Sequence, residues 1–173
     1  MKLRVVVIGR DRKGRFEPAI QDYATRIAAM QPFELVVAGE AQGDDEAARR
    51  AEAELLRAKL RPRDLVVLLD ERGEELTSEA LASRIQRVER SGGRDLAFVI
   101  GGPSGLDSEL RSEEAGFAGR RAKADAGGRS IGSEASWTIA LSRLTLPHQL
   151  ARLVLVEQLY RALTILRGQP YHK

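Results

Sequence analysis

Cysteine is absent from this chain, and histidine occurs only twice among its 173 residues. The absence of cysteine excludes disulfide bonds, thiolate metal sites and a cysteine nucleophile. With two histidines a histidine-rich metal centre is not expected either, so we predict no metal site. No apolar run reaches the roughly 20 residues of a membrane-spanning helix, and the chain starts in a strand-like run without a secretory leader. We therefore expect a cytoplasmic protein that does not contact a membrane.

The composition that remains is that of an ordinary globular protein, 43% hydrophobic and 31% charged. At this length we expect a single domain over residues 1–173. The charge is unevenly distributed. The chain has 28 bases and 25 acids, yet residues 143–173 contain five bases and one acid. The whole positive excess therefore lies in the last fifth of the chain, where a polyanion such as nucleic acid is the natural partner.

Strand-like and helix-like patterns alternate along the first hundred residues. Continuous apolar runs predict strands at residues 3–9, 33–38, 65–69 and 96–100, and helical periodicity predicts helices at about 18–30, 44–60 and 77–90. This alternation predicts an α/β domain with a mostly parallel sheet flanked by helices. Ligands bind beyond the carboxyl ends of such strands, where we expect Asp70, Gly101 and the Ser142–Arg143 turn. The glycine-rich run at residues 101–105 is by itself a weak signal, since a plain tight turn is at least as good a reading.

The C-terminal stretch is the most distinctive part of the chain. A strand is predicted over residues 137–141, and a helix from about His148 to Leu166, ended by Gly168. The helix is apolar almost all round, and its polar positions are predicted to form one narrow stripe made of Gln149, Arg152, Glu157, Arg161 and Thr164. A helix this apolar does not lie on a solvated surface, so it is either a core helix or half of a subunit interface.

Three motifs carry a resemblance to a known family. They are FVIGGPSGL at residues 98–106, LSRLTLPHQLARLVLVEQLYRA at residues 141–162 and PYHK at residues 170–173. On these residues the chain resembles the RlmH family, which are SPOUT-class methyltransferases of large-subunit ribosomal RNA. The starts of the first and third strands, MKLRVVVIG and LVVLLDERG, are also similar, so the resemblance covers nearly the whole chain.

The resemblance implies a fold, a donor and a substrate. The C-terminal part of the domain is expected to be threaded into a deep trefoil knot, and the working form is expected to be a homodimer. The donor is expected to be S-adenosylmethionine. The substrate is expected to be a pseudouridine in helix 69 of 23S ribosomal RNA, methylated at N3 in assembled 70S ribosomes. The apolar C-terminal helix supports the homodimer independently, because it needs a partner surface.

The resemblance also assigns residues by motif match. The donor contacts that it implies are Leu69, Gly101, Leu141, Ser142, Arg143, Leu144, Thr145 and Leu146. The candidate catalytic residues are Glu157, Arg161, Tyr171 and His172.

Chemistry at N3 gives these candidates different roles. Methylation requires loss of the imide proton of N3, and a cation from Arg161 or Lys173 would stabilise the resulting anion. His172 is a candidate base if the tail folds over a partner's site, and the alternative is a disordered terminus. Glu157 and Arg161 stand four residues apart and are expected to orient one another. As a plain surface pair they would contribute only a few tenths of a kcal/mol.

The chain departs from the family at one place. Leu106 and Trp137 are 31 positions apart, whereas family members have little more than a dozen residues there. The extra residues, at about 107–136 with an Arg/Gly-rich part at 116–133, are either a flap over donor or RNA or an inert excursion. Three rival functions stay open: a SPOUT enzyme acting on transfer RNA, a non-enzymatic ribosome-binding factor, and a flavodoxin-like or nucleotide-binding domain.

Overall fold

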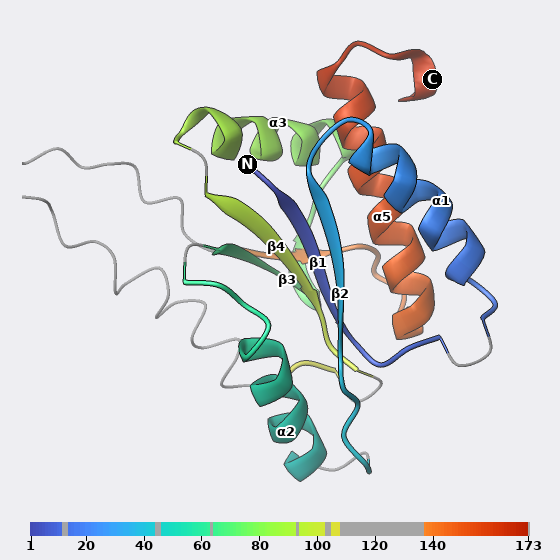
Figure 1. Ribbon diagram of the computed structural model, residues 1–173, viewed down its shortest axis with the longest axis vertical. Helices are drawn as coiled ribbons and strands as arrows, with labels where there is room; N and C mark the ends of the chain where they lie inside the picture. The colour runs from blue at the N-terminus through green and yellow to red at the C-terminus, as the bar shows by residue number, and fades with distance from the viewer. Residues whose placement is uncertain are drawn as a thin grey trace, which may run out of the picture.

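The structure, a computed structural model, describes residues 1–11, 14–43, 46–62, 64–92, 94–102, 105–107 and 137–172. Within these residues five strands form one parallel sheet in the order β2-β1-β4-β3-β5 (Figure 1). The strands are β1 (Leu3–Ile8), β2 (Phe33–Ala38), β3 (Asp64–Glu75), β4 (Asp95–Ile100) and β5 (Trp137–Ala140). The predicted α/β class with a parallel sheet is therefore confirmed. The expected insertion lies outside the described residues apart from Asp107.

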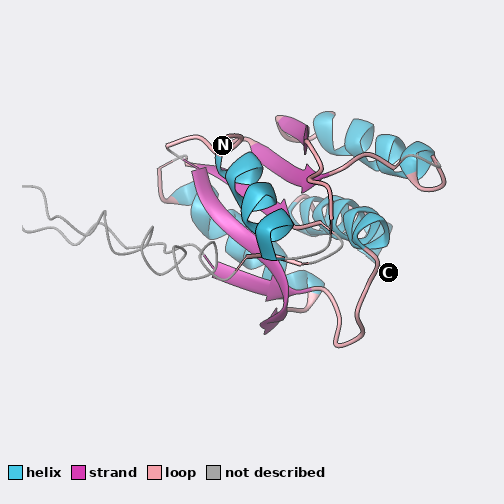
Figure 2. Ribbon diagram, turned by 90° about the horizontal axis from the view of Figure 1, so that it is seen from below, coloured by secondary structure: helices cyan, strands magenta, loops and turns pink. Residues whose placement is uncertain are grey.

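Helices cover both faces of this sheet (Figure 2). They are α1 (Glu17–Ala28), α2 (Glu46–Arg57), α3 (Ser78–Arg90) and α5 (His148–Leu166), followed by a short 3-10 helix, η1 (Pro170–His172). Alternate residues of a strand point to opposite faces, and β1 shows this directly: Leu3, Val5 and Val7 pack with α1, α3 and α5. Val6 and Ile8 pack with α2 on the other face. The continuous apolar run of β1 is thus explained by burial on both sides.

Strand β3 differs from its prediction. The apolar run at 65–69 predicted a short strand, but β3 continues to Glu75. It pairs with β5 up to Leu69 and again from Glu74, so the four residues between are displaced from the ladder. Gly73 lies so close to β5 that an added Cβ would be 2.4 Å from the carbonyl carbon of Ile139. The extension was missed because its residues are polar and largely exposed, which is the pattern of a loop.

Helix α5 has the predicted bounds, but its polar residues do not form one stripe. Arg152 and Thr164 are completely buried. Arg152 donates from Nη2 to the carbonyl oxygens of Gly9, at 2.7 Å, and Ile8, at 3.3 Å. Thr164 donates from Oγ1 to the carbonyl oxygen of Arg161 at 2.7 Å. The stripe prediction was wrong because a fully packed helix satisfies its polar groups with nearby backbone carbonyls, whatever direction they lie in.

Helix α5 is packed between α1 and α3 (Figure 1). Its other side is only half-buried in the single chain and carries the apolar residues Leu150, Leu153, Val154 and Ile165 together with Glu157 and Arg161. Among the described residues, no helix is long and apolar enough to cross a membrane.

Candidate functional site

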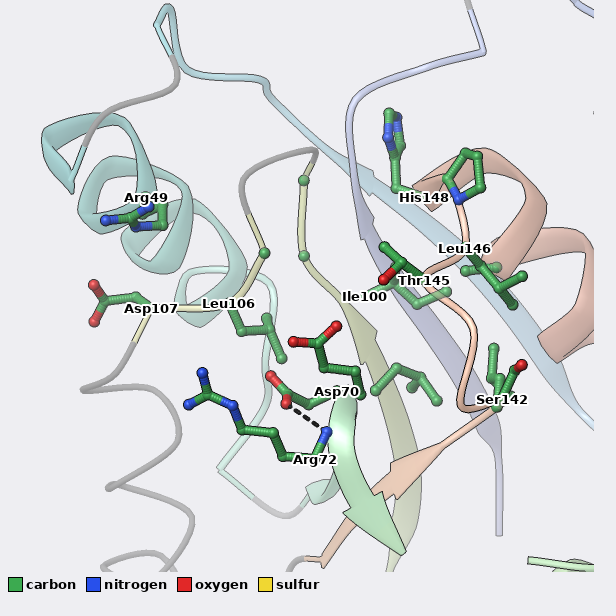
Figure 3. A pocket seen from close by; sticks show the side chains of 18 of the residues that line it. Arg49, Asp70, Arg72, Ile100, Leu106, Asp107, Ser142, Thr145, Leu146 and His148 are labelled. Atoms are coloured by element: carbon green, nitrogen blue, oxygen red, sulfur yellow. Dashed lines mark hydrogen bonds between the residues drawn. The ribbon is translucent and has the colours of Figure 1, made fainter. Parts of the chain in front are cut away.

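A pocket of about 880 Å³ opens at the carboxyl ends of β3 and β4. Its floor is apolar and comes from the strand ends and the segment before α5 (Figure 3). The residues of this floor include Leu69, Ile100, Leu106, Leu141 and Leu146. A crevice beyond the carboxyl ends of parallel strands is where α/β proteins bind their ligands.

A tight glycine turn forms one wall of this pocket. Gly105 has a φ of +81°, which favours glycine. Its backbone N–H donates to the carbonyl oxygen of Gly102 at 3.0 Å and closes the turn. An added Cβ on Gly101 would lie 3.0 Å from the carbonyl carbon and oxygen of Gly105. The turn is therefore narrow, and a side chain at Gly101 would force it open.

The segment between β5 and α5 forms the opposite wall. Ser142 accepts a hydrogen bond at its Oγ from the backbone N–H of Leu144, at 2.9 Å, which bends the chain. Seven of the eight residues predicted as donor contacts line the pocket, namely Leu69, Gly101, Leu141, Ser142, Leu144, Thr145 and Leu146. Arg143 does not. Its side chain is 88% exposed and pairs with Glu75 at 3.1 Å.

The rim of the pocket carries charges that the motif match did not assign. Glu46 and Arg49 come from α2, and Glu71 and Arg72 come from the displaced part of β3. Asp70 and Asp107 also line the pocket, so among the described lining residues acids outnumber bases by four to two. Figure 3 shows Arg49, Asp70, Arg72 and Asp107 around the same opening. A lining with this balance favours a cationic ligand. Only Asp70 had a sequence signal, as a polar residue directly after an apolar strand.

His148 lies at the lip of the pocket, at the first turn of α5. Burial lowers the pKa of this imidazole, and the charge of Arg152 lowers it further. The ring is therefore neutral at neutral pH. Its Nε2 lies 2.9 Å from Nε2 of Gln149, so it accepts a hydrogen bond from the amide.

The predicted catalytic residues form a second polar group, which we call the Glu157 cluster: Glu157, Arg161 and Tyr171. Arg161 donates to Oε1 of Glu157 from Nε, at 3.0 Å, and from Nη2, at 2.7 Å. Tyr171 donates its hydroxyl to the same oxygen at 3.2 Å. The guanidinium of Arg161 lies 5.0 Å from the ring centre of Tyr171. The backbone of His172 follows in η1.

The pocket adjoins the first turn of α5, whereas Glu157 lies at the middle of this helix and Arg161 in its second half. His148 is nine residues from Glu157 and thirteen from Arg161. At 1.5 Å per residue these separations correspond to about 14 Å and about 20 Å along the helix axis. Within one chain, the two groups predicted to serve one reaction are therefore not in contact.

A parallel α/β sheet with a glycine turn and a pocket at the carboxyl ends of its strands is an arrangement in which many α/β proteins bind nucleotides or related ligands. A family model described as predicted SPOUT methyltransferase matches residues 1–117 and 126–172. The chain belongs to the SPOUT methyltransferase family, and the resemblance seen in its motifs is confirmed.

Named relatives extend this finding. A protein of Anaeromyxobacter sp. (strain Fw109-5) named Ribosomal RNA large subunit methyltransferase H is 51% identical over 175 residues, which cover all of both chains. One of the same name from Anaeromyxobacter dehalogenans (strain 2CP-C) is 48% identical over 178 residues, again over all of both chains. Another, from Pelobacter propionicus (strain DSM 2379 / NBRC 103807 / OttBd1), is 38% identical over 173 residues, 99% of each chain.

Proposed function

We propose that this enzyme transfers a methyl group from S-adenosylmethionine to N3 of a pseudouridine in helix 69 of 23S ribosomal RNA, acting on assembled 70S ribosomes in the cytoplasm. The observation that carries the proposal is the convergence of seven motif-matched residues from three separate segments on one pocket. The names of relatives up to 51% identical over their full length support ribosomal RNA as the substrate.

The pocket fits the proposed donor in chemistry and in size. Its apolar floor suits an adenine ring, and about 880 Å³ is within the usual range for a ligand of that size. The glycine turn leaves backbone groups open to close approach at Gly105, where an added Cβ would meet nothing within 4 Å. The excess of acids on the rim suits a donor that carries a positive sulfonium. When bound, S-adenosylmethionine supplies the electrophilic methyl group.

The residues of the Glu157 cluster would then act on the nucleobase. The N3–H proton would pass to solvent water, and the guanidinium of Arg161 would stabilise the negative charge that is left on the imide. N3 would then take the methyl group, with S-adenosylhomocysteine as the leaving group. Glu157 already accepts hydrogen bonds from Arg161, Tyr171 and Gln158. A carboxylate bonded this extensively acts as an anchor that fixes Arg161 and Tyr171. Alignment of the two reactants supplies the larger part of the rate gain, up to roughly 7–11 kcal/mol of barrier.

If both groups serve one reaction, their separation within one chain favours the participation of a second chain. We propose a homodimer in which the Glu157 cluster of one subunit faces the pocket of its partner. The half-buried side of α5 supports this, because Leu150, Leu153 and Val154 gain burial only against another surface. The deep trefoil knot of the family belongs to the same proposal, with the segment before α5 as its threaded part.

Methyl transfer from labelled S-adenosylmethionine tests the substrate. Assembled ribosomes, free large subunits and bulk transfer RNA are offered in parallel, and labelled RNA is mapped to the nucleotide. Label at the helix 69 pseudouridine of assembled ribosomes supports the proposal. Label in transfer RNA alone would show that the substrate is transfer RNA, while the donor is as proposed. Donor binding without transfer to any RNA would indicate a ribosome-binding factor.

A pair of glycine variants tests the donor site itself. Gly101→Ala places a Cβ 3.0 Å from the backbone of Gly105 and should weaken donor binding more than about tenfold, because the turn must open. Gly39→Ala is the matched control, since its Cβ meets only a Leu55 methyl at 3.6 Å, an ordinary contact. Equal donor affinity in both variants, measured by calorimetry, would show that the glycine turn does not contribute to donor binding.

A further inference from the structure

The C-terminal tail is tied to the first helix of the domain by a hydrogen bond between two tyrosines. The hydroxyl oxygens of Tyr23, on α1, and Tyr171, in η1, lie 3.0 Å apart, although the residues are 148 positions apart in sequence. Tyr171 uses its single proton to donate to the carboxylate of Glu157, which only accepts. Tyr23 must therefore be the donor of the bond between the two hydroxyls. A directed chain runs from Tyr23 through Tyr171 to Glu157.

The ring of Tyr23 is itself held in place. Its centre lies 5.8 Å from that of Tyr160, which in turn makes an edge contact with Tyr171 at 4.7 Å. The guanidinium of Arg26 lies 5.7 Å from both the Tyr23 and the Tyr160 ring centres. Asp22 fixes that guanidinium at 2.8 Å. The hydroxyl of Tyr23 is therefore presented to Tyr171 by a packed surface of α1 and α5.

A second tie reaches the same carboxylate from the opposite side. Gln158 donates from Nε2 to Oε2 of Glu157 at 2.6 Å, and its own Oε1 accepts from the hydroxyl of Ser78 on α3 at 2.7 Å. This arm holds Glu157 from α3 but does not reach the tail. The bond from Tyr23, in contrast, connects the tail to α1. The bond from Tyr23 and the contacts of Gln158 can therefore be removed independently by mutation.

We propose that Tyr23 is a positioning residue for methyl transfer: its hydroxyl fixes Tyr171, and through it the C-terminal turn, in the geometry that the reaction needs beside Arg161. The inference rests on the proposed catalytic role of the Glu157 cluster. Tyr23 lies far outside the C-terminal motifs. In the sequence it is only one position of the helix predicted at about residues 18–30. Its contribution is orientational, because the hydroxyl is already occupied by Tyr171 and does not itself meet the substrate.

Tyr23→Phe removes one hydroxyl and keeps the ring that packs on Tyr160. We expect kcat to fall about tenfold, since a small misplacement of a positioned group is sufficient for such a loss. The KM values for donor and ribosomes should stay within about twofold, and the melting temperature should fall by less than about 4 °C. Thr25→Val is the matched control on the same helix. It removes an exposed hydroxyl that donates to the carbonyl of Gln21 at 2.9 Å. Its kcat should equal that of the wild type.

A double-mutant cycle separates positioning from a general structural effect. Adding Tyr23→Phe to the Tyr171→Phe variant should cause no further loss of kcat. Additive losses would overturn the inference, because Tyr23 would then act by another route.

The same cycle distinguishes this inference from the proposed function. A Tyr171→Phe enzyme with full activity would remove the tail from catalysis, and with it the premise of the inference. A slow Tyr171→Phe enzyme beside an unimpaired Tyr23→Phe enzyme would overturn the role of Tyr23 alone. Loss of activity in Tyr23→Phe that is matched by equal loss in Thr25→Val would show a general effect on α1, which also overturns it.

Discussion

Replacing Arg161 with alanine should reduce activity much more than it reduces stability. In the folded protein its side chain is 29% exposed and that of Glu157 is 20% exposed. An ion pair with this exposure contributes at most about 1 kcal/mol to folding. For a chain of this size that corresponds to a melting temperature lower by about 2–4 °C. Loss of a cation that stabilises transition-state charge reduces kcat by about 10²–10³-fold, which is roughly 2.7–4 kcal/mol.

The assay is therefore a comparison of Arg161→Ala with Arg161→Lys and with a control. Arg161→Lys keeps the charge but loses the two-pronged bond to Glu157, so its kcat should fall between those of Arg161→Ala and the wild type. Arg57→Ala removes an arginine that pairs with Glu54, three residues earlier on α2 and not among the pocket residues, and should leave kcat unchanged. Single-turnover methylation of ribosomes and thermal melts give both quantities. A kcat for Arg161→Ala within threefold of wild type, on the order of one RT of barrier, would refute the electrostatic role.

Three further predictions concern the scaffold. Gly73→Ala should lower the free energy of unfolding by about 1–3 kcal/mol in urea titrations, because its Cβ would overlap the Ile139 backbone; an unchanged midpoint contradicts the close approach. Arg4→Met leaves the buried carboxylate of Asp64 without its ion-pair partner and should cost about 3–5 kcal/mol. Adding Asp64→Leu should restore most of that loss in thermal melts, and no restoration would mean that packing alone was lost. Burial raises the pKa of Glu52, so the folded state holds that proton more tightly than the unfolded state, and stability falls as pH rises from the ordinary carboxyl pKa toward the raised one. Glu52→Gln should flatten the stability curve above the ordinary carboxyl pKa, and an unaltered slope would contradict the assignment.

Local sequence signals predicted most of the scaffold. The run Phe33–Ala38 is a strand with the predicted ends, because a proline precedes it and a glycine follows it. Helix α5 also has its predicted ends. Strand β3 was predicted too short, because the pairing of Glu74 and Glu75 with β5 is a tertiary contact that no local pattern encodes. Residue types predict the local structure of a segment, but not which other segment pairs with its edge.

The site divides in the same way. The glycine turn and the segment before α5 were identified by motif match, and these residues do line one pocket. Glu46 and Arg49 were not, because α2 is brought to the pocket only by packing on the second face of the sheet. The bond from Tyr23 to Tyr171 was equally out of reach, since neither residue carries a pattern that points to the other across 148 positions.

Helix α5 has a consequence for how this enzyme tolerates change. One uninterrupted helix of 19 residues carries the lip of the pocket at its first turn and Arg161 near its last. It therefore fixes the distance between the pocket and Arg161, the two groups to which the proposed function assigns donor binding and catalysis. Each inserted residue would turn one end against the other by about 100° and lengthen the rod by 1.5 Å. We therefore expect substitutions along this helix to be tolerated as far as packing allows. We expect insertions and deletions within it to reduce methyl transfer.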